Sequence, residues 1–286
     1  MTATSQVAAV LTLKAPSRSG AVSAPAQRRW SQLNVPLTNW TGRRVWLVGA
    51  SSGIGLACAQ ALRAAGAVVM ISARQPQGVI DWAAQDSGVQ WHPLDVTVPA
   101  DVQATAGRIL ADGPIDLLVY AAGYYRAQRA TALDVQDLLQ HDRVNYQGAL
   151  HVLDAVLPDM LARQSGHISL LSSVAAWRGL PNGLAYGPTK AALTHLAETL
   201  YMDLQDQNIG VSVISPGFVA TPLTAQNQFA MPALLSPEQA AAEMLKGWAS
   251  GQFDIHFPKR FTWWLKCLRL LPYRLYFPLV RKFTGL

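Results

Sequence analysis

Two side chains that could exchange a proton stand four residues apart in the stretch GLAYGPTKAAL. Tyr186 and Lys190 precede an apolar helical pattern, and residues four apart on a helix share one face. A nearby ammonium group favours the phenolate form of tyrosine, and moving its pKa from about 10 to about 7 needs roughly 4 kcal/mol. Pro188 between them requires the helix to begin here, since proline lacks an N–H donor. This spacing is common in helices, so the surrounding residues decide whether it is an acid/base pair.

A glycine-rich turn offers a candidate phosphate site. The stretch RRVWLVGASSGIGLACAQAL places Gly49, Gly53 and Gly55 between an apolar run and a helical pattern. Glycine lets the backbone turn sharply and approach a ligand, and the N–H groups that begin a helix bind anions. We therefore expect the pyrophosphate of a dinucleotide at this turn.

Apolar runs separated by helical stretches must position these residues. Continuous hydrophobicity within each run indicates strands buried on both faces, and helices between the strands indicate a parallel sheet. The sequence therefore predicts a single doubly wound α/β fold of the Rossmann type, with about seven strands and helices on both faces. The predicted strands cover residues 45–50, 68–73, 89–94, 115–122, 167–172, 211–215 and 254–257.

Taken together, the motifs resemble those of the short-chain dehydrogenase/reductase family, in the branch with T-G-x-x-x-G-I-G and Y-x-x-x-K. The resemblance extends through about residue 258 and implies an oxidoreductase with a nicotinamide cofactor. Val48, Tyr120 and Ala121 depart from the family pattern, and we expect altered bracing of loops rather than lost activity. The motifs that carry the resemblance are the glycine turn, LDV (94–96), AAG (121–123), VNYQG (144–148), SS (172–173), YGPTK (186–190) and SPGFVATP (215–222).

The resemblance implies a catalytic role for four residues. Tyr186 is expected to exchange the proton, and Lys190 to assist it and to bind the nicotinamide ribose. Ser173 is expected to hold the substrate oxygen, and Asn145 to hold a water that links Lys190 to solvent. The alternatives are a strand-end cap for Ser173 and a helix-interior hydrogen bond for Asn145.

The resemblance also implies cofactor contacts on several loops. Asp95 is expected to bind the adenine amino group, Ala122 and Gly123 to pass beneath the adenosine, and Val219 and Thr221 to hold the carboxamide. The complete expected set is Gly49, Ser51, Ser52, Gly53, Ile54, Gly55, Arg74, Asp95, Val96, Ala122, Gly123, Tyr186, Lys190, Pro216, Gly217, Val219 and Thr221.

The end of the second predicted strand favours NADP(H) over NAD(H). A carboxylate about twenty residues beyond the glycines would accept hydrogen bonds from the adenosine ribose hydroxyls of NAD. This chain has Ala73 and Arg74 instead. A guanidinium group binds a 2′-phosphate through charge-assisted hydrogen bonds, so we expect NADP(H). The alternative is an ordinary exposed arginine at the end of a strand.

Aromatic and aliphatic residues are expected to form the substrate wall. Tyr124, Tyr125, Trp177, Arg178 and residues 222–235 carry few charges, which favours an apolar or lipid-like ketone or aldehyde and its alcohol. The expected substrate-binding set is Ser173, Tyr125, Trp177 and Tyr186.

Basic residues concentrate at the two ends of the chain. The net charge is +6, but residues 255–286 hold seven basic residues and no acid, and residues 1–44 hold six and no acid. This distribution favours a surface anchor and gives no reason to expect nucleic-acid binding. In the C-terminal segment, Phe261, Trp264, Leu265, Leu268 and Leu271 fall at helical spacing, with Lys266 and Arg269 off that stripe, and Pro272 ends the helix. We expect a basic amphipathic helix lying at a membrane surface, with a dimer contact or a cap over the substrate as alternatives.

We therefore expect three regions: a largely disordered extension over residues 1–40, an NADP-binding catalytic domain over 41–258, and an amphipathic tail over 259–286. No run of apolar residues is long enough for a membrane-spanning helix. The two cysteines, Cys58 and Cys267, form no CxxC pair, so no metal site is expected. We expect a cytoplasmic protein, possible peripheral membrane contact, and a homodimer or homotetramer by family resemblance.

The sequence supports two competing functions less well. A regulator that binds NADP without turnover would commonly lose part of the acid/base set, whereas this chain keeps all four residues. A sugar-nucleotide epimerase is disfavoured by the tight glycine spacing.

Overall fold

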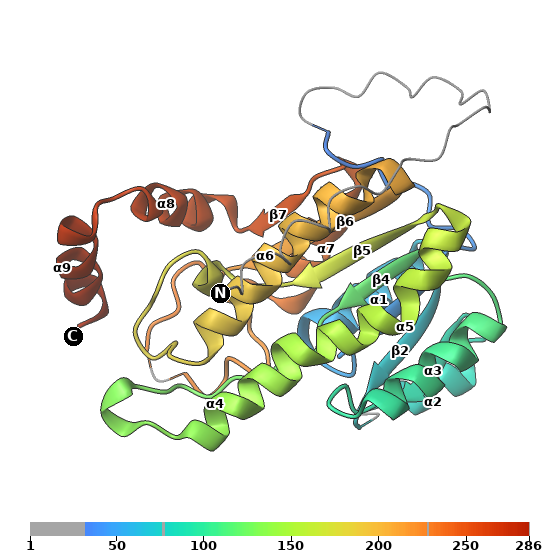
Figure 1. Ribbon diagram of the computed structural model, residues 1–286, viewed down its shortest axis with the longest axis horizontal. Coiled ribbons are helices and arrows are strands. Elements are labelled where there is room, and N and C mark those ends of the chain that lie inside the picture. Colours follow the sequence, from blue (N-terminus) through green and yellow to red (C-terminus); the bar gives the residue numbers. More distant parts are fainter. Residues whose placement is uncertain (1–31, 76–77, 228, 286) are drawn as a thin grey trace, which may run out of the picture.

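The sheet of this protein is built from parallel strands alone. The computed structural model describes residues 32–75, 78–227 and 229–285, so the expectation for residues 1–31 falls outside it. The described residues form a seven-stranded sheet in the order β3-β2-β1-β4-β5-β6-β7 (Figure 1). All seven predicted strands are confirmed, with ends shifted by at most two residues. The strands are β1 (Arg44–Val48), β2 (Val68–Ala73), β3 (Val89–Pro93), β4 (Leu117–Tyr120), β5 (Gly166–Leu171), β6 (Ile209–Pro216) and β7 (Asp254–Phe257).

Helices cover both faces of the sheet, as the predicted doubly wound fold requires. One face packs against α1 (Gly53–Ala64), α2 (Val79–Gln85) and α7 (Pro237–Ala249). The other packs against α3 (Pro99–Ala111), α5 (Gly148–Arg163) and α6 (Tyr186–Leu204). A short helix α4 (Val135–Asp142) runs into a π-helical segment η2 (Arg143–Gln147), which leads directly into α5.

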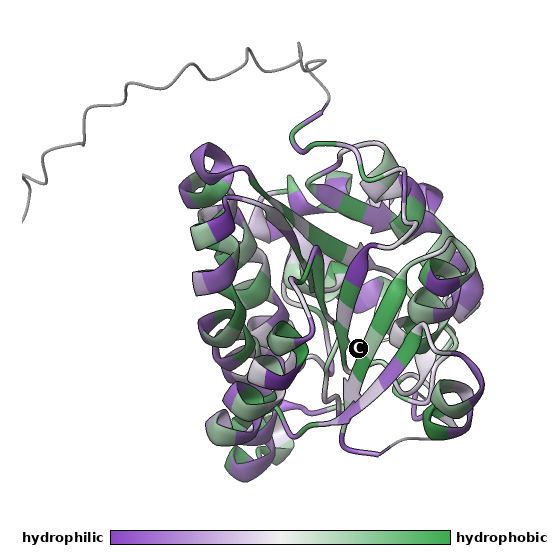
Figure 2. Ribbon diagram, turned by 90° about the vertical axis from the view of Figure 1, so that its right-hand side faces the viewer, coloured by the Kyte–Doolittle hydropathy of each residue, from purple (hydrophilic) through white to green (hydrophobic). Residues whose placement is uncertain are grey.

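Successive side chains along each strand enter opposite cores, which explains the continuous apolar runs. In β1, Val45 and Leu47 pack with the α1 and α7 side, whereas Trp46 and Val48 pack with the α5 side. Fully burying a side chain of this size contributes about 1.5–3 kcal/mol. Figure 2 shows the result, with hydrophobic residues along the strands and hydrophilic residues on the outer faces of the helices.

The strand order creates the crevice that holds the candidate site. β1 pairs in parallel with β2 on one side and with β4 on the other, so the chain reverses its direction of progress across the sheet at β1. The loops that follow β1 and β4 therefore diverge at the carboxyl edge of the sheet. Ligands of doubly wound folds bind at such a switch point.

Residues 32–40, just ahead of β1, pack onto the body, although the sequence placed them in a largely disordered extension over residues 1–40. Leu37 and Trp40 are buried in the core beside α7, and Trp40 contacts Trp248 edge to face. Asn34 adds a strand-like pair of hydrogen bonds with Val211, at 2.8 and 3.0 Å. Little periodicity is visible in this stretch of the sequence because these three residues are anchored singly in a segment without regular structure.

The C-terminal segment is helical, as predicted. It forms α8 (Lys259–Arg269) and α9 (Tyr273–Thr284), separated at Pro272 where the sequence predicts a break. Figure 1 shows both helices projecting from the end of β7. No helix within residues 32–75, 78–227 and 229–285 combines the length and hydrophobicity needed to cross a bilayer.

Candidate active site

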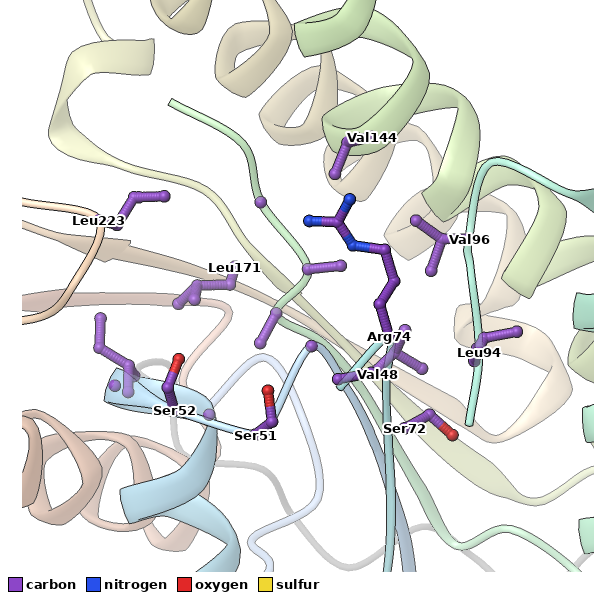
Figure 3. Close-up of a pocket in the computed structure, with 18 of the residues that line it drawn as sticks. Val48, Ser51, Ser52, Ser72, Arg74, Leu94, Val96, Val144, Leu171 and Leu223 are labelled. Atoms are coloured by element: carbon purple, nitrogen blue, oxygen red, sulfur yellow. The ribbon is translucent and has the colours of Figure 1, made fainter. Parts of the chain in front are cut away.

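A cavity of about 470 Å³ opens at the carboxyl ends of the strands around the switch point. Its wall comes from the loop after β1, the ends of β2 and β3, the loop after β4 and the loop after β6 (Figure 3). The structure brings together most of the predicted cofactor residues here. Those lining the cavity are Gly49, Ser51, Ser52, Gly53, Ile54, Gly55, Arg74, Asp95, Val96, Ala122, Gly123 and Thr221.

The three glycines of the turn are needed for close backbone packing. A Cβ at Gly49, which has a φ of +85°, would lie 2.3 Å from the backbone of Ala122. A Cβ at Gly55 would lie 2.6 Å from the carbonyl oxygen of Gly49. Gly53 also has a positive φ, +55°, and faces the side chain of Thr221. The turn therefore holds the start of α1 against the loop after β4, at the cavity wall.

This wall fits an anionic dinucleotide. The first turn of α1 contains no acidic residue, and the helix begins at Gly53 with its N-terminus on the cavity. The N–H groups and the positive end of the helix dipole bind phosphate at such a position. Arg74 adds a guanidinium group that extends from the end of β2 across the cavity toward Val144 (Figure 3).

Asp95 is held in a fixed orientation at the cavity wall. Its Oδ1 accepts hydrogen bonds from the backbone N–H and the hydroxyl of Thr97, at 2.9 and 2.7 Å. Such a carboxylate is placed to recognise a donor on a ligand. Its predicted contact with an adenine amino group stays a prediction.

The phenol of Tyr186 stands at the start of α6, beside Ser173. Ala185 precedes the helix and Pro188 occupies its first turn, so the requirement that the helix begin here is confirmed. The ring of Tyr125 contacts that of Tyr186 edge to face, with centroids 5.0 Å apart. Ser173 is buried, and its hydroxyl also accepts a hydrogen bond from the N–H of Ala175 at 3.1 Å. Both the expected substrate contact and the strand-end cap are therefore compatible with Ser173.

Lys190 lies one turn further along α6 and is buried. Its Nζ is 5.6 Å from the centre of the Tyr186 ring and donates a hydrogen bond to the carbonyl oxygen of Leu171 at 2.7 Å. A Cβ built on Gly123 would lie 3.8 Å from this Nζ. Since Gly123 lines the cavity, the amine reaches the edge of the candidate cofactor site.

The expected lowering of the Tyr186 pKa by Lys190 is not found among the groups of the chain itself. Burial raises the pKa of Tyr186 to about 12, partly opposed by a hydrogen bond with Ser173. Burial also lowers the pKa of Lys190 to about 7, so the amine is only partly charged at neutral pH. Spacing alone predicted the shared face but not this desolvation, which opposes charge on both groups.

Asn145 links the loop after β4 to α6 by hydrogen bonds. Its Oδ1 accepts a hydrogen bond from the N–H of Tyr124 at 2.7 Å, and its Nδ2 donates to the Tyr124 carbonyl and to the Thr189 hydroxyl, both at 3.0 Å. Thr189 in turn donates to the carbonyl oxygen of Tyr186 at 2.9 Å. Asn145 is therefore a buried connector, and its proton-relay role stays a prediction. Thr189 was missed, although it lies within the YGPTK motif.

The departure at Tyr120 supplies the altered bracing that the sequence led us to expect. Its buried hydroxyl donates a hydrogen bond to the carbonyl oxygen of Val144, in the π-helical segment that carries Asn145. A Cβ on Gly148 would lie 2.4 Å from that hydroxyl oxygen. Glycine at position 148 thus makes room for Tyr120.

The loop after β6 reaches the cavity through Thr221, while its other predicted cofactor residues lie elsewhere. Val219 is buried in the core, and Gly217 packs against Phe261 of α8 and donates its N–H to the Phe257 carbonyl at 2.8 Å. Pro216 ends β6. The roles of Pro216, Gly217 and Val219 toward a cofactor stay predictions.

The expected substrate wall is divided between two places. Tyr125 contacts Tyr186, and Gln226 donates a hydrogen bond to the Tyr125 carbonyl at 2.8 Å, so this part of the predicted substrate wall approaches the site. Trp177 instead packs edge to face on His256, 5.8 Å between centroids, and Arg178 contacts α8 and α9. The structure does not bring these two residues to Tyr186.

Sequence reasoning missed several residues of the cavity wall. Most are apolar and lie at or next to the carboxyl end of a strand, where strand termination was the available signal. They are Val48, Ser72, Ala73, Gln75, Leu94, Ala121, Val144 and Leu171. Pro222 and Leu223 also line the cavity, although the sequence placed them in the substrate wall.

Known proteins resemble this chain in sequence. The profile of a family described as short chain dehydrogenase matches residues 43–231. An uncharacterised oxidoreductase from Myxococcus xanthus is 35% identical over 237 residues, which cover 80% of this chain and 93% of that protein. The 2-keto-3-deoxy-L-fuconate dehydrogenase of Xanthomonas campestris is 33% identical over 206 residues, covering 72% of this chain and 67% of that protein.

Solved structures resemble it in fold. A short-chain dehydrogenase from Streptomyces avermitilis superposes with a TM-score of 0.73 and 25% identity, covering 79% of this chain and 92% of that one. A short chain dehydrogenase from Burkholderia cenocepacia, solved in complex with NADP, gives a TM-score of 0.75 at 23% identity and covers 85% of this chain and 99% of that one.

Proposed function

This chain belongs to the short-chain dehydrogenase family of oxidoreductases, and from that premise we propose that it interconverts an apolar ketone or aldehyde and its alcohol with NADP(H). The observation that carries the proposal is the meeting of Tyr186, Lys190 and Ser173 beside a cavity that the glycine turn lines. One group of residues can hold a dinucleotide, and the other can move a proton beside it.

The cavity fits the cofactor that the family implies. The glycine turn and the start of α1 would hold the pyrophosphate, Asp95 the adenine, and Lys190 the nicotinamide ribose. Arg74 on the cavity wall, with no carboxylate beside it in the sequence, supports a preference for a 2′-phosphate. When bound, the cofactor supplies or accepts the hydride at the substrate carbon.

The chain's own residues handle the oxygen and its proton. The hydroxyls of Ser173 and Tyr186 hold the substrate oxygen, and Tyr186 donates a proton to it during reduction. Since the pKa of Tyr186 is raised to about 12, the phenol stays protonated at neutral pH and is suited to this direction. Alcohol oxidation needs the phenolate form of Tyr186. As long as the pH stays below the pKa, the phenolate fraction increases about tenfold for each unit by which the pH increases.

Aromatic neighbours support an apolar substrate. The Tyr125 ring flanks Tyr186, and the hydroxyl of Tyr125 hydrogen-bonds with Asn227 at 3.1 Å in the segment after β6. Burial also raises the pKa of Tyr125, so this ring adds no charge near neutral pH. A neutral aromatic wall beside the reactive phenol favours a substrate whose carbonyl is its main polar group.

The direct test is Tyr186→Phe, which removes the proton donor and keeps the ring. We expect NADPH binding to persist and kcat for ketone reduction to fall by about 100-fold to 10,000-fold, the usual range for a general acid. Wild-type alcohol oxidation should also accelerate as pH rises from about 7 to about 10, whereas reduction should not, because the phenol remains protonated. A screen of steroid, fatty-acyl and small aromatic ketones, followed by NADPH absorbance, supplies the substrate.

The matched control is Tyr201→Phe on the same helix. Tyr201 lies near the opposite end of α6 from Tyr186, and its hydroxyl donates a hydrogen bond to the carbonyl oxygen of Leu33 at 2.7 Å. This variant should keep wild-type turnover. If Tyr186→Phe reduced ketones at the wild-type rate, the catalytic assignment would be wrong. If the wild type bound NADPH but turned over no substrate, the alternative of a cofactor-sensing regulator would gain.

A further inference from the structure

We propose that α8 and α9 form a docking surface for an anionic lipid bilayer. The pair of helices, residues 259–284, is called here the C-terminal hairpin. It lies beyond residues 43–231, which the family profile matches, so family membership does not account for it. The proposal concerns this surface alone and holds whatever the substrate is.

Most of the apolar stripe expected to face lipid packs inside the protein. Phe261 packs on Phe218 and Gly217, and Leu265 and Leu268 join Tyr276 and Val280 in a small core between the two helices. Four of the five stripe residues therefore mark the inward face of α8, which corrects the sequence interpretation. Trp264 is the exception, since it is 46% exposed and points outward with the residues described next.

A second set of apolar side chains points outward from the hairpin. Its members are aromatic or leucine, and between 46% and 83% of each is exposed. Single exposed apolar residues are ordinary, but a cluster of this kind within 26 residues marks an interaction surface. The outward set is Trp263, Trp264, Leu270, Tyr273, Leu275, Phe277 and Phe283.

The charge of the hairpin selects the partner. It carries seven basic residues and no acid. Lys266 pairs with Asp254 at 2.5 Å, whereas the other six are exposed and pair with no carboxylate among the described residues. Tryptophan and tyrosine favour the bilayer interface, and lysine and arginine are attracted to anionic headgroups. The exposed basic residues are Lys259, Arg260, Arg269, Arg274, Arg281 and Lys282.

Arg178 holds the hairpin in a fixed pose. Its Nη1 donates to the carbonyl oxygens of Arg269 and Leu271 at 2.8 and 2.6 Å, at the end of α8. Its guanidinium carbon lies 4.5 and 4.0 Å from the ring centres of Tyr273 and Tyr276 in α9. The outward side chains are thus presented by folded, braced helices, so binding a membrane does not require the hairpin to fold first.

The exposed cysteine of the hairpin gives a direct probe. Cys58 is buried and burial raises its pKa strongly, whereas Cys267 lies exposed on α8. A thiol-reactive, environment-sensitive fluorophore should therefore label Cys267 in the full chain. We expect a blue shift on adding phosphatidylcholine vesicles that contain phosphatidylglycerol, little shift with phosphatidylcholine alone, and reversal in high salt. Sedimentation of unlabelled protein with the same vesicles gives a second measurement.

Two double variants test the two ingredients. Leu270→Ser with Leu275→Ser removes apolar contact, and Arg274→Glu with Lys282→Glu reverses charge; each should weaken vesicle binding about tenfold or more. The control for the apolar variant is Leu133→Ser with Val135→Ser, which changes two exposed apolar residues in the loop before α4 and in its first turn. The control for the charge variant is Arg108→Glu with Arg129→Glu, which changes the net charge by the same amount. These controls should bind as the wild type does.

Three results would overturn the proposal. They are equal binding to neutral and anionic vesicles, equal losses in the hairpin variants and their controls, and no binding by correctly folded wild type. Light scattering distinguishes the main rival occupant, a second copy of this chain on the same surface. If the hairpin variants changed a dimer into a monomer without affecting vesicle binding, the surface would be a subunit contact.

Discussion

At the residue scale, the pKa values of the ionisable groups in the site depend on burial as much as on neighbouring groups. Tyr186 and Lys190 share a helix face, but desolvation moves each toward its neutral form. The amine of Lys190 is also occupied by the Leu171 carbonyl. In the proposed mechanism, proton donation from a neutral phenol is therefore the direction that the chain itself favours.

Arg74 carries the prediction on cofactor choice. Replacing Arg74 with Glu puts a carboxylate where the proposal places a 2′-phosphate, so NADPH should bind more weakly while NADH gains. The loss of charge-assisted hydrogen bonds, about 1.5–3 kcal/mol, corresponds to a change of roughly 10- to 100-fold in the NADPH/NADH ratio of kcat/KM. Arg129→Glu, away from the cavity wall, is the control. An unchanged ratio in Arg74→Glu would mean that Arg74 does not select the cofactor.

The sequence predicted which residues belong to the site better than it predicted where their side chains point. The glycines and Asp95 line the cavity as predicted because their motifs follow the ends of β1 and β3, and Thr221 reaches it from the loop after β6. Trp177 lies in the loop after β5, four residues beyond Ser173. The sequence does not say toward which side of this loop the Trp177 ring points. It packs toward His256 because the later strand β7 passes there, and local sequence does not record that contact.

At the element scale, the π-helical segment was the feature that periodicity could not reveal. One extra residue per turn between α4 and α5 leaves the apolar pattern on both sides almost intact. Yet it places Asn145 where it bonds Tyr124 and Thr189, and it exposes the Val144 carbonyl to Tyr120. The strands, by contrast, were predictable since burial on both faces leaves an uninterrupted apolar run.

Gly148 tests how tightly this segment is packed. Gly148→Ala would bring a Cβ to 2.4 Å from the Tyr120 hydroxyl and 2.7 Å from Val96, both buried. We expect a loss of about 1–3 kcal/mol in the free energy of unfolding, measured by thermal or denaturant unfolding, from overpacking. Tyr120→Phe in the same background should recover part of the loss, because it removes the crowded oxygen.

Gly107 in α3 provides the comparison for this prediction. A Cβ there meets nothing within 4 Å, so Gly107→Ala should be neutral or stabilising by up to about 1 kcal/mol, from helix propensity. Equal effects of the two substitutions would show that Gly148 is not required for packing around Tyr120.

At the scale of the whole molecule, one arginine, Arg178, joins the hairpin to the loop that follows Ser173. Arg178→Ala removes hydrogen bonds to the end of α8 and the stacking on Tyr273 and Tyr276. We expect faster amide hydrogen exchange across residues 259–284, with the sheet still protected. Arg108→Ala, which removes a hydrogen bond to Thr105 within α3, is the control. Unchanged exchange in the hairpin of Arg178→Ala would mean that the small core around Leu268 holds it unaided.

The charge pattern of the ends was visible in the sequence, but the way the hairpin packs was not. Helical spacing correctly predicted the first helix and the break at Pro272, but it did not specify α9 as a second helix. It could not tell which apolar residues meet the protein, because α8 and α9 have hydrophobic residues on more than one side and their mutual contact occupies only part of them.

The anchoring of Asn34 beside the first residues of β6 gives the molecule a usable orientation. Residues 32–40 lie at the amino edge of the sheet, while the crevice and the hairpin lie at or beyond its carboxyl edge (Figure 1). A tether attached ahead of residue 32 would hold the molecule at the amino edge of the sheet and leave the crevice and the hairpin facing solution. Capture on a sensor surface through that end is therefore preferable to a carboxyl-terminal tag, which would sit on the hairpin itself.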